Sequence, residues 1–144
     1  MSREDVDTVR DALMAFNSGD LARILTVADP QIEAQVPASI SSEPDTYRGH
    51  EGIRRYFESF WDVMDEIRFE GERFADAGES IVVDLRVTAK GRQTGILVEQ
   101  RNAGVWIVRD GRVLGIRAYA SFPEALEAAG LPGQWADERK LSDR

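Results

Sequence analysis

The chain contains no cysteine and a single histidine, His50, among its 144 residues. Without cysteine it cannot form a disulfide, use a thiolate nucleophile or bind zinc through thiolates. A single histidine excludes metal sites built from several imidazoles, and it excludes most catalytic triads that use histidine as the base. No motif in the sequence implies a metal ion or an organic cofactor, so we expect neither.

Basic residues and long apolar runs are also scarce. The 18 Lys and Arg residues are outnumbered by 26 Asp and Glu residues, which gives a formal net charge of −8 and a pI near 4.7. Since binding to phosphate backbones and anionic membranes depends largely on Lys and Arg, we expect no nucleic acid and no membrane partner. No apolar run approaches the ~20 residues of a membrane span, and the N-terminus lacks the apolar core of a signal peptide. We therefore expect a cytoplasmic protein.

What is present is the composition of an ordinary globular domain, with 42% hydrophobic and 31% charged residues. A chain of this length is typical of one domain and can bury about two-thirds of the surface that it exposes when unfolded. We predict one domain over residues 1–131, followed by a polar C-terminal tail over residues 132–144.

Apolar residues at helical spacing predict helices in the first half of the chain. A first helix carries Val9 and Phe16 on one face and ends at Gly19. Asp20 caps a short second helix. The segment from residue 52 to residue 64 is the most clearly amphipathic. Residues 32–36 have the pattern of a short strand, and the Ser- and Pro-rich residues 37–46 predict a loop or lid.

The pattern then changes to strands, separated by turn signals rich in Asp and Gly. Four strands are expected, at residues 67–75, 81–89, 96–108 and 113–120. Ser121 and Glu124 form the capping box of a short last helix. Helices followed by strands predict an α+β fold in which a cone-shaped, curved antiparallel sheet wraps round the N-terminal helices. The apolar interior of the cone is the expected ligand site.

Three segments in this order and spacing resemble the SnoaL-like family of the nuclear transport factor 2-like superfamily: residues 17–21, residues 47–53 and residues 106–131. The resemblance covers roughly residues 5–131 and implies the cystatin-like α+β barrel of that superfamily. It implies no single activity, because the superfamily holds isomerases, cyclases, dehydratases, epoxide hydrolases and non-enzymatic binders. Relatives are commonly homodimers through the outer face of the sheet, so a homodimer of that kind is implied as well.

Ketosteroid isomerases of this superfamily need an Asp base and an oxyanion hole made by a Tyr and a protonated Asp. Carried over to this sequence, the base falls on Gln35 or Val36, the Tyr on Ala12 and the second oxyanion donor on Gly104. None of these side chains can perform its role. Chemistry of the ketosteroid isomerase type is therefore not expected.

Limonene epoxide hydrolase, another relative, uses an Asp-Arg-Asp arrangement. Those positions fall on the apolar residues Leu85, Val87 and Ala118. Asp84 and Arg86 are one residue away, and strand alternation turns them to the opposite face of the sheet. A shift of one residue in the register would bring Asp84 and Arg86 into the cone as a catalytic pair. Otherwise they belong to a polar face that is exposed to solvent.

Six residues are candidates for the pocket wall: Gln35, Tyr56, Trp61, Gln100, Asn102 and Trp106. The amides can hydrogen-bond a ligand carbonyl or hydroxyl, or they can satisfy backbone groups or lie at a dimer interface. The aromatic residues can line the pocket or form plain core. The position of His50, at the entry to a helix, is more typical of a surface or capping residue than of a catalytic one.

Three functions therefore stay open. The sequence favours a small-molecule-binding domain with a mostly apolar internal pocket that lacks the usual acid and base residues. The alternative is a SnoaL-like enzyme of the polyketide cyclase, isomerase or epoxide hydrolase type, acting on an apolar cyclic substrate. Such an enzyme needs a buried carboxylate or histidine in the cone. The third is an interaction protein whose cone is filled by its own side chains.

Overall fold

The computed structural model describes residues 2–38 and 45–131. The elements follow in the order α1 (Ser2–Asn17), α2 (Leu21–Val27), β1 (Ala28–Val36), β2 (Asp45–Arg48), α3 (Gly49–Trp61), β3 (Met64–Asp76), β4 (Ser80–Gly91), β5 (Leu97–Arg109), β6 (Arg112–Tyr119) and α4 (Phe122–Ala128). The predicted α+β class is confirmed. The predicted tail and most of the predicted lid lie outside the described residues.

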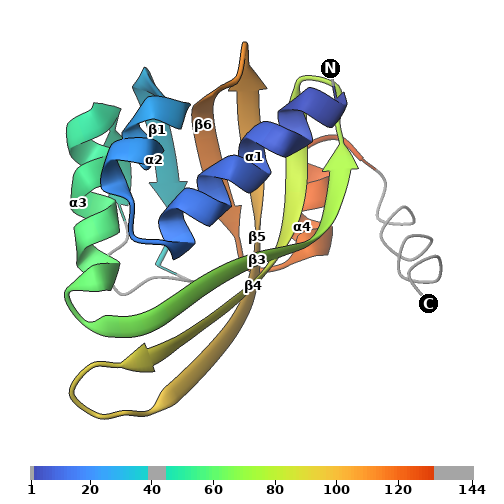
Figure 1. Cartoon of the computed structure of the whole chain (residues 1–144). Coiled ribbons are helices and arrows are strands. Elements are labelled where there is room, and N and C mark those ends of the chain that lie inside the picture. The colour runs from blue at the N-terminus through green and yellow to red at the C-terminus, as the bar shows by residue number, and fades with distance from the viewer. Residues whose placement is uncertain (1, 39–44, 132–144) are drawn as a thin grey trace.

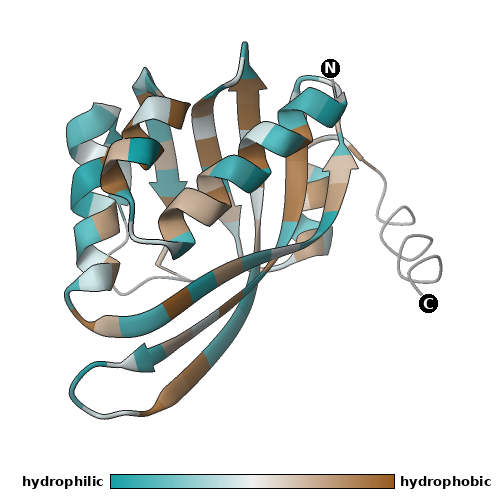
Figure 2. Ribbon diagram, viewed as in Figure 1, coloured by the Kyte–Doolittle hydropathy of each residue, from teal (hydrophilic) through white to brown (hydrophobic). Residues whose placement is uncertain are grey.

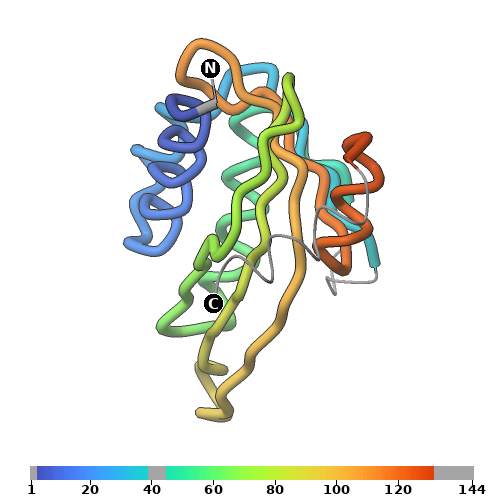
Figure 3. Tube along the Cα trace, turned by 90° about the vertical axis from the view of Figure 1, so that its right-hand side faces the viewer, coloured from blue at the N-terminus to red at the C-terminus, as the bar shows by residue number. Residues whose placement is uncertain are grey.

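All six strands belong to one curved sheet, in the order β2-β1-β6-β5-β4-β3. Helices α1, α2 and α3 lie against its inner face, and α4 packs on the outer face (Figures 1 and 3). Every pairing is antiparallel except that of β1 with β6, which is parallel. The expectation of a wholly antiparallel sheet is wrong at this pairing. The chain crosses from β2 through α3 to the far edge of the sheet, and the meander β3 to β6 returns to β1 from there.

Strand β3 is bent at two places, between Asp65 and Arg68 and between Gly71 and Arg73, where its register with β4 shifts. Bulges of this kind increase the twist and curvature of a strand. Glu66, in the first of these irregularities, has a positive φ of 53°. The bends carry β3 round the helices, so the sheet has the curved form that the sequence predicted.

Strand β2 and the start of α3 differ from the prediction. The residues before α3 were expected to form only a helix-entry turn, but Tyr47 and its neighbours pair with β1 as a four-residue strand. So short a strand shows no alternation in the sequence. The helix begins at Gly49 instead of residue 52 and ends at Trp61 instead of residue 64. Gly52 faces the backbone of β2, since a Cβ there would lie 2.8 Å from the carbonyl carbon of Tyr47.

The sheet is buried on both faces near its centre. One apolar cluster fills the space between the helices and the inner face, and a second lies between the outer face and α4. For this reason residues 81–85 of β4 are buried without interruption. Away from α4, apolar and polar residues alternate along the long strands (Figure 2). No helix among the described residues is long and apolar enough to cross a membrane.

Asn17, the last residue of α1, joins the helix to the edge strand β3. Its Nδ2 donates a hydrogen bond to the Phe69 carbonyl oxygen at 3.0 Å, and the Phe69 N–H donates to its Oδ1 at 2.6 Å. Strand β3 has a partner strand on one side only, so the backbone of Phe69 would otherwise lack partners at this half-buried position. The Asn17 amide completes the edge as a short piece of strand would.

We expect Asn17→Ala to lower the free energy of unfolding by about 1–3 kcal/mol, because both backbone groups of Phe69 lose their partner. Asn17→Asp keeps the acceptor but loses the donor, so its effect should also be destabilising. Urea denaturation followed by circular dichroism measures both. Thr26→Ala is the control, since this exposed hydroxyl bonds only within α2 and its loss should cost less than about 0.5 kcal/mol. Equal losses for Asn17→Ala and Thr26→Ala would contradict the role of Asn17.

Candidate ligand-binding site

A cavity of about 120 Å³ lies between the helices α1 to α3 and the inner face of the sheet. Its wall is almost entirely apolar, with Phe16, Ile53 and Phe60 on the helix side and Leu85 and Ile116 on the sheet side. An engineered cavity of about 150 Å³ in another protein stays dry and binds benzene. The cavity is therefore of the size that suits a single ring and not a polycyclic skeleton.

Four residues at alternate positions of β5 line the wall: Gln100, Asn102, Gly104 and Trp106. Gln100 is exposed, Asn102 is half-buried and Trp106 is buried. The strand thus runs along the cavity from its exposed end to its interior. That these residues contact a ligand stays a prediction.

The structure does not bring Gln35 and Trp61 to the cavity. Gln35 is exposed, while its neighbours Ala34 and Val36 line the wall, because alternate residues of β1 point to opposite faces. Trp61 lies behind the wall, with its ring 5.8 Å from the ring of Phe57, and it covers Gly19. Trp61 therefore belongs to the core around the cavity and not to its lining.

Tyr56 lines the cavity and also belongs to an aromatic cluster. Its ring centroid lies 4.9 Å from that of Tyr47 and 5.0 Å from that of Phe60. On α3, the same side chains therefore pack in the core and line the cavity. Burial raises the pKa of the Tyr56 phenol well above its ordinary value, and the neighbouring Tyr47 adds to the effect. A phenol is protonated at neutral pH even at its ordinary pKa, so Tyr56 can donate a hydrogen bond there.

The wall contains no carboxylate and no imidazole among the described residues. All but one of the positions to which the family resemblance assigned catalytic roles reach it: Ala12, Val36, Leu85, Val87, Gly104 and Ala118. The exception is Gln35, the second possibility for the base. Each of the six that reach the wall carries a side chain that cannot transfer a proton.

Asp84 and Arg86 point to the outer face and do not form a pair. Asp84 is only 5% exposed, and it accepts hydrogen bonds from Nε and Nη2 of Arg73 at 2.9 and 2.8 Å. The Arg73 guanidinium in turn lies over the ring of Phe122, 4.6 Å from its centroid. The prediction of a solvent-exposed polar face fails for Asp84, because α4 covers this part of the sheet.

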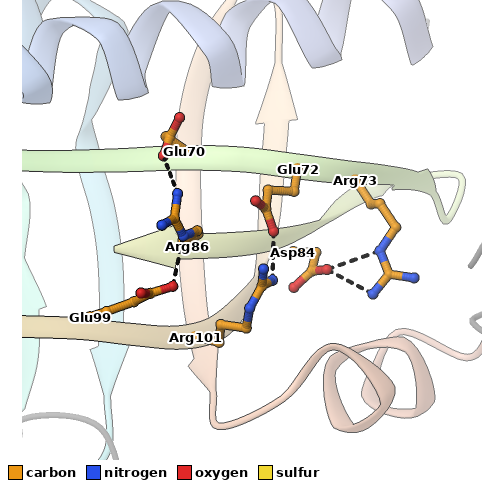
Figure 4. A network of polar contacts seen from close by, with 7 residues as sticks. All are labelled: Glu70, Glu72, Arg73, Asp84, Arg86, Glu99 and Arg101. Atoms are coloured by element: carbon orange, nitrogen blue, oxygen red, sulfur yellow. Dashed lines mark hydrogen bonds and ion pairs between the residues drawn. The ribbon is translucent and has the colours of Figure 1, made fainter. Parts of the chain in front are cut away.

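Arg86 belongs to a separate row of charges. Its Nε donates to Glu99 at 2.7 Å and its Nη1 to Glu70 at 3.3 Å, and Arg101 pairs with Glu72 beside them (Figure 4). The hydrogen bond from Arg86 lowers the pKa of the Glu99 carboxyl. Glu99 is exposed and Arg86 is half-buried, and neither residue lines the cavity, so this row belongs to the surface of the outer face.

His50 also lies away from the wall. Its Nε2 is 2.8 Å from the carbonyl oxygen of Ala28, which ties the first turn of α3 to the start of β1. Within the described part of the chain, no cluster of three or more His, Asp or Glu side chains could hold a metal ion. A structural role for His50 fits this contact.

Sequence reasoning missed one polar atom of the cavity region, the indole nitrogen of Trp106. This Nε1 is buried and has no hydrogen-bond partner, and it lies 2.8 Å from where a Cβ of Gly104 would be. In the sequence, the only indication of this contact is the spacing of Gly104 and Trp106, which places both residues on one face of β5. It shows that they are neighbours, but it does not show which way an indole ring turns.

Comparison with known proteins gives a family match and several similar structures. Residues 9–116 match the SnoaL-like domain. No curated protein matches the chain. A nuclear transport factor 2-like protein from Burkholderia xenovorans is 27% identical, with a TM-score of 0.68 over 88% of this chain and 95% of that chain.

Two further structures contain small molecules. TerC, co-crystallised with polyporic acid, is 20% identical, with a TM-score of 0.72 over 86% of this chain and 98% of that chain. A protein of ketosteroid isomerase-like fold from Catenulispora acidiphila, in complex with trimethylamine, is 15% identical, with a TM-score of 0.70 over 89% and 95%. At these identities the likeness shows the fold alone. Since the domain match spans most of the sequence, the chain belongs to the SnoaL-like domain family and has the nuclear transport factor 2-like fold.

Proposed function

We propose that this protein binds a small, neutral and mostly apolar cyclic molecule in the cavity, without acid or base catalysis. One observation carries the proposal. The cavity is present, and the positions that would hold catalytic groups reach its wall, yet Ala12, Gly104 and Ala118 stand there instead. An apolar wall favours a ligand that gains free energy by leaving water.

The size of the cavity bounds the affinity. Small ligands gain at most about 1.5 kcal/mol per non-hydrogen atom, and most gain much less. For a molecule with one ring we expect a dissociation constant on the order of 0.1 mM, which corresponds to about −5.5 kcal/mol. The polyporic acid co-crystallised with TerC and the trimethylamine in the Catenulispora protein support the use of this fold for binding small molecules.

The alternative is an enzyme of the cyclase, isomerase or epoxide hydrolase type. Among the described residues of the wall, Tyr56 is the one ionisable side chain, and burial raises its pKa, which already lies well above 7, still further. It can orient a ligand oxygen by donating a hydrogen bond, but it is a poor proton acceptor. This favours binding over catalysis.

Filling the cavity should weaken ligand binding. We expect Ala118→Leu to weaken the binding of acetophenone at least tenfold, because the added carbons occupy space that a single ring needs. Isothermal titration calorimetry measures the affinity, and circular dichroism checks that the variant is folded. Ala120→Leu is the matched control, since Ala120 is exposed and lies outside the wall. A folded Ala118→Leu variant with wild-type affinity would place the ligand elsewhere.

Asp84 should matter for stability and not for the ligand. We expect Asp84→Asn to lower the free energy of unfolding by about 2 kcal/mol, because the largely buried Arg73 loses its charged partner. The affinity for acetophenone should stay within twofold of the wild type. Chemical denaturation and calorimetry measure the two quantities. A large loss of affinity with unchanged stability would instead favour the hydrolase alternative.

We also propose that the protein forms a homodimer through the outer face of its sheet. Beyond α4 this face carries the row of alternating charges in Figure 4, with Glu70, Arg86 and Glu99 on three neighbouring strands. Under a two-fold axis such a row can meet its own complement. Leu97, which is 80% exposed, lies on the same face of β5 as Glu99 by strand alternation. It would be covered in such a dimer.

Leu97→Lys should raise the dimer dissociation constant at least tenfold, because the interface would then have to bury an unpaired charge. Sedimentation equilibrium measures the constant. Met14→Lys is the control, since Met14 is 67% exposed but lies on α1, on the other side of the sheet. A wild-type protein that stays monomeric at about 0.1 mM would contradict the proposed dimer.

A further inference from the structure

Trp106 lines the cavity and carries an unsatisfied hydrogen-bond donor. The side chain is 7% exposed and lines the wall from β5. Its Nε1 is buried and has no hydrogen-bond partner. A buried N–H group without a partner costs about 1–3 kcal/mol, so each such group in a native protein calls for an explanation. An unpaired donor at a cavity therefore points to a partner that arrives from outside the chain.

The position of the nitrogen follows from Gly104. A Cβ at residue 104 would lie 2.8 Å from Nε1 and 3.2 Å from Cδ1 of the Trp106 ring. Gly104 itself lines the cavity, so the polar edge of the indole lies on the cavity side of β5. The absence of a side chain at residue 104 makes room for this edge. The hydrogen-bond donor next to Gly104 is thus the indole N–H of Trp106.

The surroundings decide which acceptor suits the donor. Neither Lys nor Arg lies among the described wall residues, so nothing there would balance the charge of a carboxylate. The indole N–H is a neutral donor, and it can only donate. A neutral carbonyl oxygen accepts such a bond, and its ring fits the apolar wall. A hydrocarbon of the same shape would leave the N–H unpaired.

We propose that the Trp106 N–H is a specificity-determining donor, which selects single-ring ligands that carry a neutral carbonyl oxygen over hydrocarbons of the same shape. This inference rests on the proposed binding function and adds the chemical class of the ligand. Trp61 offers a comparison within the same chain. Its Nε1 is also buried and unpaired, but its ring does not line the cavity.

The test uses acetophenone and α-methylstyrene, which share a skeleton and differ in C=O against C=CH₂. We expect the wild type to prefer acetophenone. In Trp106→Phe the ratio of the two affinities should fall about fivefold to tenfold, the range expected for one net hydrogen bond. Trp61→Phe removes the same group outside the cavity, so its ratio should stay within twofold of the wild type. Each substitution also changes the shape of the protein around the ligand, but this change affects both ligands alike and cancels in the ratio of their affinities.

A second readout needs no variant to fold. In ¹⁵N–¹H spectra of the wild type, the indole signal of Trp106 should move downfield with acetophenone and much less with α-methylstyrene. The indole signal of Trp61 should stay in place with both.

A third variant tests the space beside the indole. Gly104→Ala forces a methyl group against Nε1 of Trp106, so it should reduce the preference for acetophenone in the same direction as Trp106→Phe.

The outcomes separate the two proposals. If neither probe binds the wild type, the binding function and the role of Trp106 both fail. If both probes bind, but the affinity ratio and the Trp106 indole signal do not respond as expected, the binding function stands and the donor is another group. Tyr56 and the amides of β5 would then be the next donors to examine.

Discussion

The edge strand β3 has backbone groups that no further strand pairs with, and Asn17 provides their hydrogen-bond partner at Phe69. Its amide forms two reciprocal hydrogen bonds with the backbone of Phe69, between the two bends of β3. These bonds hold the end of α1 against the strand that curls furthest round the helices. The helices and the inner face of the sheet therefore enclose a space of defined width. The cavity depends on this width, since α1 supplies Phe16 to its wall.

The two faces of the sheet divide the chemistry of the protein. The inner face carries apolar side chains and a few neutral donors, whereas the ion pairs drawn in Figure 4 lie on the outer face of β3, β4 and β5. Alternation enforces this division, because Asp84 and Arg86 must point away from the cavity once Leu85 points into it. A wall without ionised groups suits a neutral ligand. The same wall leaves the indole N–H of Trp106 as a buried donor that can discriminate between neutral ligands.

Much of this could be predicted from the sequence where the pattern was long. Alternation over β4 and β5 predicted which residues reach the wall, and six positions counted from the resemblance to the family do line it. The pattern was uninformative where elements were short. Strand β2 has only four residues, and its pairing with β1 depends on contacts distant in sequence. For β1, the count allowed both Gln35 and Val36 at one position. Only the pairing with β2 and β6 decided that Val36 faces inward.

The α+β class, the family and the lack of acid and base groups at the expected catalytic positions could all be predicted from the sequence. These properties depend on local periodicity and on residue identity, which are present in the unfolded chain. The tertiary structure alone decided that Asp84 is buried under α4, that Trp61 lies behind the wall and that β1 runs parallel to β6. It also decided the direction of the Trp106 indole. Each of these features depends on which elements distant in the sequence pack together, and the pattern of a single strand or helix does not indicate that.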